Sequence, residues 1–304
     1  MFYRLSGTFH TNYQADRKLW KIPADRWQVI VLLVIAVLAP FFVSPLYLGS
    51  YVLPWIIWSA AALSLTLLMG MAGQLHFGFA AVMAIGAYSS IHLVRFGVPF
   101  EIALFLSGVI AAVIGAIFGS AALRVKGLYL VMATLAMQYL VDWVVVNVPA
   151  ISGGAHATLR TPAVSFLFMD ISSLSSRYWL ALGGVSGAIL AFCYYRAVTP
   201  EQFGFDVSIQ LVAMVLVGGL GSVIGSYLGA GFVLLAPIIL TNWIAGLAGA
   251  GWIPVSQNFL SHLPLVFYGA MIIGFLLFEP LGLAKIYDNI RKYFLVWPFR
   301  HARS

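Results

Sequence analysis

Charged side chains are scarce in this chain: Asp, Glu, Lys and Arg make up only 8% of its 304 residues. A soluble domain normally has about 25% charged residues, so this sequence cannot form a solvated surface. Hydrophobic residues make up 62% of the chain. We therefore expect the lipid bilayer to be the solvent for most of the molecule, which leaves no room for a soluble domain of ordinary size.

Cysteine and the usual catalytic motifs are also scarce or missing. Cys193 is the single cysteine, which excludes an internal disulfide and a cysteine-based metal site. No His, Cys and Asp residues have metal-ligand spacing. There is no P-loop, and Gly184-Val-Ser-Gly187 has the wrong spacing for a nucleophile elbow. We expect neither an enzyme nor a cofactor site in this chain.

The basic residues that are present lie mainly at the two ends. Ten of the sixteen fall within residues 1–26 and 279–304. Basic flanks on apolar spans mark cytoplasmic ends near anionic lipid, so we do not expect nucleic-acid binding. The sequence predicts a cytoplasmic tail at 1–26, a transmembrane domain at 27–278 and a basic cytoplasmic tail at 279–304. We expect the first apolar run to be a permanent anchor, because no signal-peptide cleavage pattern follows it.

Long apolar runs predict an all-α fold, a polytopic transmembrane helix bundle of about eight to nine spans. The runs are 28–43, 51–70, 77–94, 102–123, 128–148, 178–195, 207–220, 222–240 and 264–278. Nine spans would place the two basic termini on opposite sides of the membrane. The short basic loop Arg124–Lys126 agrees with a cytoplasmic N-terminus. Nine runs therefore disagree with two cytoplasmic termini, and the run that is extra or missing must lie after residue 148.

Small residues recur at helical spacing in two places. Gly115 and Gly119 are four residues apart, and Gly221, Gly225 and Gly229 form a longer stripe. Such stripes allow helices to approach closely in lipid. We predict helix packing, rather than a direct role in transport, for both groups.

Polar residues inside the apolar runs are the candidates for a substrate path. Thr134, Gln138 and Asp142 share one helix face. They line a path or form a polar seam between helices, and Asp142 either binds an amino group or makes a structural contact. Gln74 and His76 follow Gly70 and Gly73, where a broken helix would expose backbone groups to a substrate or form a simple turn.

Two isolated histidines complete the polar residues that the sequence singles out. His92 and His262 each lie within an apolar region, without a neighbouring acidic or cysteine partner. A packing or interfacial role is expected for both.

Five motifs occur in order along nearly the whole chain. They are Gly70–Ala81 with Gly86-Ala-Tyr88, Leu123–Tyr129 with Ala133–Ala136, Ser152-Gly153-Gly154, Val198–Phe203 with Ser208–Gln210 and Gly218–Gly225, and Glu279–Ala284. Together they resemble the LivM-like permeases of branched-chain amino acid ABC importers. The glycines that match the family motifs are Gly73, Gly86, Gly127, Gly153, Gly154, Gly218, Gly219 and Gly221.

The resemblance implies a permease subunit of the bacterial inner membrane that forms half of a translocation path. Its implied partners are membrane lipid, a second LivH-like permease, two ABC ATPase subunits that bind the ATP, and a periplasmic substrate-binding protein. Branched-chain or other hydrophobic amino acids are the expected substrates, with urea, short amides and aromatic acids as alternatives. A stand-alone channel or ion-coupled carrier is the competing function, although Asp142 is the only acid within an apolar run.

The chain departs from the family in one region. LivM-like permeases have a cytoplasmic loop between the sixth and seventh spans, whose coupling helix docks on the ATPase. No such loop is found here, and residues 178–195 resemble a fusion of those two spans. The family comparison implies that about one span and the loop are missing, at the place where the span number also disagrees.

Overall fold

The computed structural model describes residue 34 and the ranges 36–122, 127–154, 157–162, 164–166, 169–170, 173–183, 195, 197–249, 257–278 and 282–296. Its contacts divide the chain into two units. One comprises Met1–Leu48 with Lys285–Ser304, and the other comprises Gly49–Ala284. Residues 1–26 lie outside the described residues, so the predicted N-terminal tail stays a prediction.

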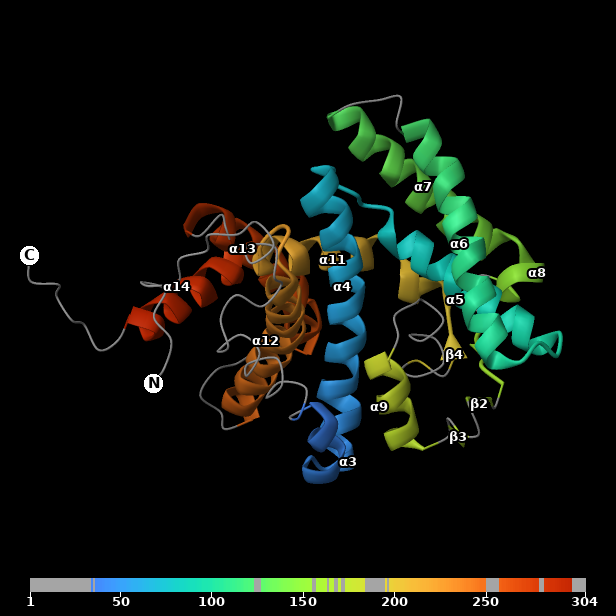
Figure 1. Cartoon of the computed structure of the whole chain (residues 1–304). Helices are drawn as coiled ribbons and strands as arrows, with labels where there is room; N and C mark the ends of the chain where they lie inside the picture. Colours follow the sequence, from blue (N-terminus) through green and yellow to red (C-terminus); the bar gives the residue numbers. More distant parts are fainter. Residues whose placement is uncertain are drawn as a thin grey trace, which may run out of the picture. The chain divides into compact units, whose positions relative to one another are not determined.

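The larger unit is a bundle of apolar helices (Figure 1). Its long helices are α4 (Leu53–Ala72), α5 (Phe79–Arg95), α6 (Phe100–Ala122), α7 (Leu128–Asn147), α11 (Phe205–Gly218), α12 (Val223–Gly249) and α13 (Gln257–Phe278). Shorter elements are η1 (Leu48–Val52), α8 (Pro149–Ser152), α9 (Leu174–Gly183) and η3 (Pro200–Phe203). α4 packs on α11 and α12, while α5 packs on α6 and α7.

Five described helical segments are long and apolar enough to cross a membrane. They are Pro45–Gly70, Phe100–Ser120, Tyr129–Asn147, Pro200–Gly218 and Val223–Gly249. The runs predicted at 77–94 and 264–278 coincide with the shorter apolar helices Phe79–Arg95 and Val266–Phe275. The chain is therefore a helical membrane protein. The runs at 28–43 and 178–195 lie partly outside the described residues, so the number of eight to nine spans stays a prediction.

α12 is longer than the sequence indicates. We predicted a span at 222–240, ended by glycine and proline, but the helix continues to Gly249. Pro237 lies inside it, and the Thr241 hydroxyl donates to the Pro237 carbonyl oxygen one turn back. Residues 241–249 contain no charged side chain, so nothing in their composition opposes continuation of the helix in lipid.

Two very short antiparallel ladders accompany the helices. β1 (Leu159–Arg160) pairs with β4 (Ala197–Val198), and β2 (Ser165–Phe166) pairs with β3 (Met169–Asp170). The all-α prediction describes the membrane helices and omits these ladders. Strands of two residues are too short to show an alternating hydrophobic pattern.

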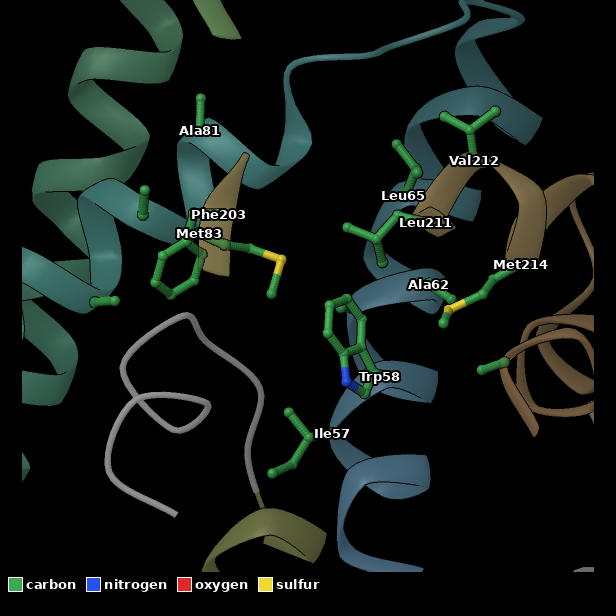
Figure 2. Close-up of a cluster of buried hydrophobic side chains, with 14 of the residues drawn as sticks. Ile57, Trp58, Ala62, Leu65, Ala81, Met83, Phe203, Leu211, Val212 and Met214 are labelled. Atoms are coloured by element: carbon green, nitrogen blue, oxygen red, sulfur yellow. The ribbon is translucent and has the colours of Figure 1, made fainter. Parts of the chain in front are cut away.

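The helices differ greatly in how much of their surface the protein covers. Within the most apolar part of each span, 61% of the residues of the α4 span are buried inside the protein, but only 17% of those of the α6 span. α11 is central: Leu211, Met214 and Val215 are fully buried. Figure 2 shows Leu211 and Met214 near Ala62 and Leu65 of α4. α6 is therefore a peripheral helix, and several of its large apolar side chains, such as Phe105 and Ile117, are exposed.

Glycines bring α11 and α12 into backbone contact. A Cβ atom on Gly229 would collide with the Met214 carbonyl oxygen, and one on Gly225 would collide with the Gly218 carbonyl oxygen. The packing prediction is confirmed for Gly225 and Gly229. It is wrong for Gly115 and Gly119 within this chain, because a Cβ atom on either would meet nothing within 4 Å on the peripheral α6.

Candidate functional site

A break between α4 and α5 forms the centre of the candidate site. α4 ends at Ala72, and Gly73 closes it in the left-handed region, with φ of 63°. α5 begins only at Phe79, so residues 73–78 are not helical. A Cβ atom on Gly78 would lie 2.6 Å from the Thr134 carbonyl oxygen, which shows that the backbone of this break lies directly against α7.

Backbone amides at the start of α5 and just before it are bound by side chains of other helices. Gly78, the residue before α5, has no capping side chain of its own. The Phe77 amide donates to Thr134 Oγ1 (3.3 Å), and the Ala81 amide donates to Gln138 Oε1 (2.9 Å). The Ala80 amide donates to the Ser208 hydroxyl of α11 (3.1 Å). Since the first amides of a helix have no intrahelical acceptor, α7 and α11 supply the caps.

Gln138 connects four segments of the chain. Its side chain is fully buried. Besides binding α5, Oε1 accepts from the Ser208 hydroxyl (3.0 Å). Nε2 donates to the carbonyl oxygen of Phe203 in η3 (2.8 Å) and to Asp142 Oδ1 (3.0 Å). We call Thr134, Gln138, Asp142 and Ser208 the polar seam. The bonds of Gln138 match the predicted alternative of a seam between helices, whereas the bond between Gln138 and Asp142 lies within α7.

A pocket of about 400 Å³ lies beside the break. Three of the five predicted path residues, Gln74, His76 and Thr134, line it, whereas Gln138 and Asp142 do not. Its wall also includes Leu75 of the break and residues of α4, α6 and α7: Leu68, Gly115, Ala116, Phe118, Gly119, Ser120, Leu130, Ala133 and Met137. The structure thus divides the predicted set into a pocket group and a seam group, with Thr134 in both.

The lining of the pocket is uncharged. It contains no Asp, Glu, Lys or Arg among the described residues. Burial lowers the pKa of His76, so this imidazole is neutral at neutral pH. Its Nδ1 accepts from the Gly78 amide (3.2 Å), a bond that the neutral ring can make. The pocket therefore suits an uncharged, mainly apolar group, with Gln74, Thr134 and Ser120 as its polar contacts.

Some residues have roles that the sequence analysis missed. Ser208 was quoted only as part of a motif, yet it binds both Ala80 and Gln138. Gly115 and Gly119 were assigned to packing but line the pocket. A serine early in an apolar helix is the one available signal for Ser208; nothing in the spacing distinguishes the α6 glycines from a packing stripe.

The remaining candidates have structural positions. Nε2 of His92 lies 2.7 Å from the Ile151 carbonyl oxygen, in agreement with a packing role. The side chain of His262 lies outside the described residues. Among the described residues, no group of three His, Cys, Asp or Glu side chains could hold a metal ion.

The motif glycines act through the backbone, and none of them lines the pocket. Gly86 is buried inside α5, and Gly218 packs against Gly225. The others have positive φ, which favours glycine: Gly73, Gly127, Gly153, Gly154, Gly219 and Gly221.

Comparison with known proteins finds a similarity to one family. Residues 47–182 match the family model described as a branched-chain amino acid transport system permease component. This range contains every residue that lines the pocket. The motifs quoted at 198–225 and 279–284 lie outside the matched range. No solved structure matches the chain significantly.

Two curated relatives have the name high-affinity branched-chain amino acid transport system permease protein LivM. The protein from Escherichia coli K12 is 31% identical over 145 residues, and the one from Salmonella typhimurium LT2 is 31% identical over 147 residues. Each match covers 47% of this chain and 34% of the relative, so the chain spans about a third of the length of the curated relatives it matches. Over residues 47–182, therefore, the chain is similar to the permease components of branched-chain amino acid transport systems, LivM among them.

Proposed function

We propose that this chain is the transmembrane permease subunit of an ABC importer for branched-chain or other hydrophobic amino acids, and that it forms half of the translocation path. The observation that carries the proposal is the family match over residues 47–182, which contains the α4–α5 break and the whole pocket. The chain is a transport component in this proposal, and catalysis of ATP hydrolysis belongs to other subunits.

The proposed assembly follows from what one permease needs. It comprises this chain, a second LivH-like permease that completes the path, two ABC ATPase subunits that bind ATP, and a periplasmic substrate-binding protein. The bacterial inner membrane is the proposed location. The absence of a P-loop motif in the sequence supports a separate ATPase.

The pocket supports an apolar substrate. Its uncharged lining and volume of about 400 Å³ fit a branched aliphatic side chain better than urea, which needs many more polar partners. The competing ion-coupled carrier would need an available membrane acid. Asp142 lies away from the pocket and accepts a hydrogen bond from Gln138, so it serves the polar seam instead.

Enlarging the α6 glycines tests the pocket directly. Gly115→Leu and Gly119→Leu place a side chain in the pocket, while a Cβ atom at either position meets no neighbour within 4 Å. We expect leucine uptake by the reconstituted importer to fall about tenfold, which corresponds to ~1.4 kcal/mol of lost binding free energy. The thermal unfolding temperature should stay the same.

Gly108→Leu is the matched control on the same helix. A Cβ atom at Gly108 also meets nothing within 4 Å, but this residue does not line the pocket. Uptake by the Gly108→Leu importer should equal that of the unchanged protein. Equal uptake by all three variants would show that the pocket is not part of the path.

Coupling to the ATPase needs its own experiment. The family match ends at residue 182, within the run 178–195 where the sequence departs from LivM-like permeases. Residues 184–194 lie outside the described residues. We propose co-expression with a LivH-like permease and the ATPases, purification through this chain, and uptake of labelled leucine. A complex with ATPase that transports leucine supports the proposal, whereas a complex without ATPase would show that the missing loop is required.

A further inference from the structure

The helix at the C-terminal end, α14 (Gly282–Val296), differs in character from the spans. Its apolar residues recur at helical spacing and form one face, which we call the apolar face: Leu283, Ile286, Tyr287, Ile290 and Phe294. Lys285, Asp288 and Lys292 share the opposite face, and Arg291 lies between the two. It is the most amphipathic of the described helices and too short and too charged to cross a bilayer.

The start of α14 is attached to the membrane bundle. A Cβ atom on Gly282 would lie 2.6 Å from the Gly219 amide nitrogen, so the two backbones touch. Leu283 packs against the hydrophobic core of the larger unit. Only residues 279–281 separate α14 from the apolar helix α13, a connection that can span at most roughly 14 Å. The first turn of α14 therefore lies close to the membrane.

Beyond this first turn, two isoleucines of the apolar face are exposed. Ile286 is 39% exposed and Ile290 is 52% exposed. The sequence from Gly282 to the C-terminus contains five Lys and Arg residues and one acidic residue, Asp288. An amphipathic helix with this charge excess is suited to the boundary between acyl chains and negatively charged headgroups.

We infer that α14 lies in the plane of the membrane surface, with its apolar face in the acyl-chain boundary and Lys285 at anionic phospholipid headgroups. This inference does not depend on the proposed transport function, since it needs only the membrane bundle to which α14 is joined. Lipid, rather than a soluble protein, is the chosen partner because α14 begins at the end of a membrane helix.

Nitroxide scanning of the full-length protein tests the placement. Single cysteines are introduced at positions 285, 286, 289 and 290 in a Cys193→Ser background and labelled. The protein is reconstituted in phosphatidylcholine vesicles with and without phosphatidylglycerol. With phosphatidylglycerol, we expect labels at 286 and 290 to collide with oxygen and to be shielded from a water-soluble nickel complex. Labels at 285 and 289 should show the reverse.

Each other outcome contradicts part or all of the inference. Equal accessibility at the four positions would exclude an in-plane helix. Labels at 286 and 290 shielded from both reagents would mean that this face packs on protein. For the anionic lipid, the Lys285→Gln variant should lose the effect of phosphatidylglycerol, which is a larger difference in reagent accessibility between the labels at 286 and 290 and those on the polar side. The Asn289→Gln variant, whose change lies on the polar side but removes no charge, should keep this effect of phosphatidylglycerol. If the unchanged protein showed the same difference in accessibility in both lipids, headgroup recognition would be excluded.

Discussion

Replacing Gln138 with leucine is expected to destabilise the helix bundle by about 2–4 kcal/mol. The substitution leaves the Ala81 amide, the Phe203 carbonyl oxygen and the Ser208 hydroxyl without their buried partner. Each buried polar group left unpaired costs roughly 1–3 kcal/mol. Hydrogen bonds between helices in membranes are weaker on average, which keeps the sum at the lower end. The first turn of α5 also loses one of its caps.

Unfolding in mixed micelles with increasing sodium dodecyl sulfate, followed by circular dichroism, measures this free energy. Asn147→Leu is the matched control on the same helix, because the Asn147 amide is exposed and donates only to the Trp143 carbonyl oxygen of its own helix. We expect a change of less than about 0.5 kcal/mol for this control. Equal unfolding midpoints for the two variants would contradict the assignment of Gln138 to a structural network.

Replacing Gly229 with alanine is expected to cost about 1–3 kcal/mol, the range for overpacking a tight contact. The new methyl group would collide with the Met214 carbonyl oxygen, and it would lie 2.7 Å from the Gly218 Cα atom. Both neighbours are backbone atoms of α11 and cannot rotate away. The two helices must separate, which loosens the backbone contact between α11 and α12.

Gly246→Ala provides the control within the same helix. Gly246 also lies in α12, but its added Cβ atom would meet nothing within 4 Å. This variant should be as stable as the unchanged protein or more stable by up to about 1 kcal/mol, because alanine favours the helix. Thermal unfolding in detergent, scored by loss of helical signal, separates the two results. If Gly246→Ala lost as much stability as Gly229→Ala, the effect would come from helix propensity and not from close packing.

The ion-poor sequence determined the membrane helices. Runs such as 102–123 and 128–148 became α6 and α7 with small changes at their ends, because backbone groups in lipid must be satisfied within the helix. The end of α12 was placed nine residues too early, because the glycines and prolines of this region were taken to divide it into shorter spans. The interruption of the helix near Gly73 was also predicted, from the two glycines that divide this apolar region.

Tertiary structure decided what each helix face meets. Helical spacing placed Thr134, Gln138 and Asp142 on one face, but only packing showed that Gln138 binds an amide 57 residues earlier in the chain. Glycine pairs with the same spacing of four had different outcomes: Gly225 and Gly229 touch α11, while Gly115 and Gly119 open into a pocket. Spacing along a chain determines which side chains share a face, because the helix period is constant. The neighbour of that face depends on contacts between distant segments, which no local pattern encodes.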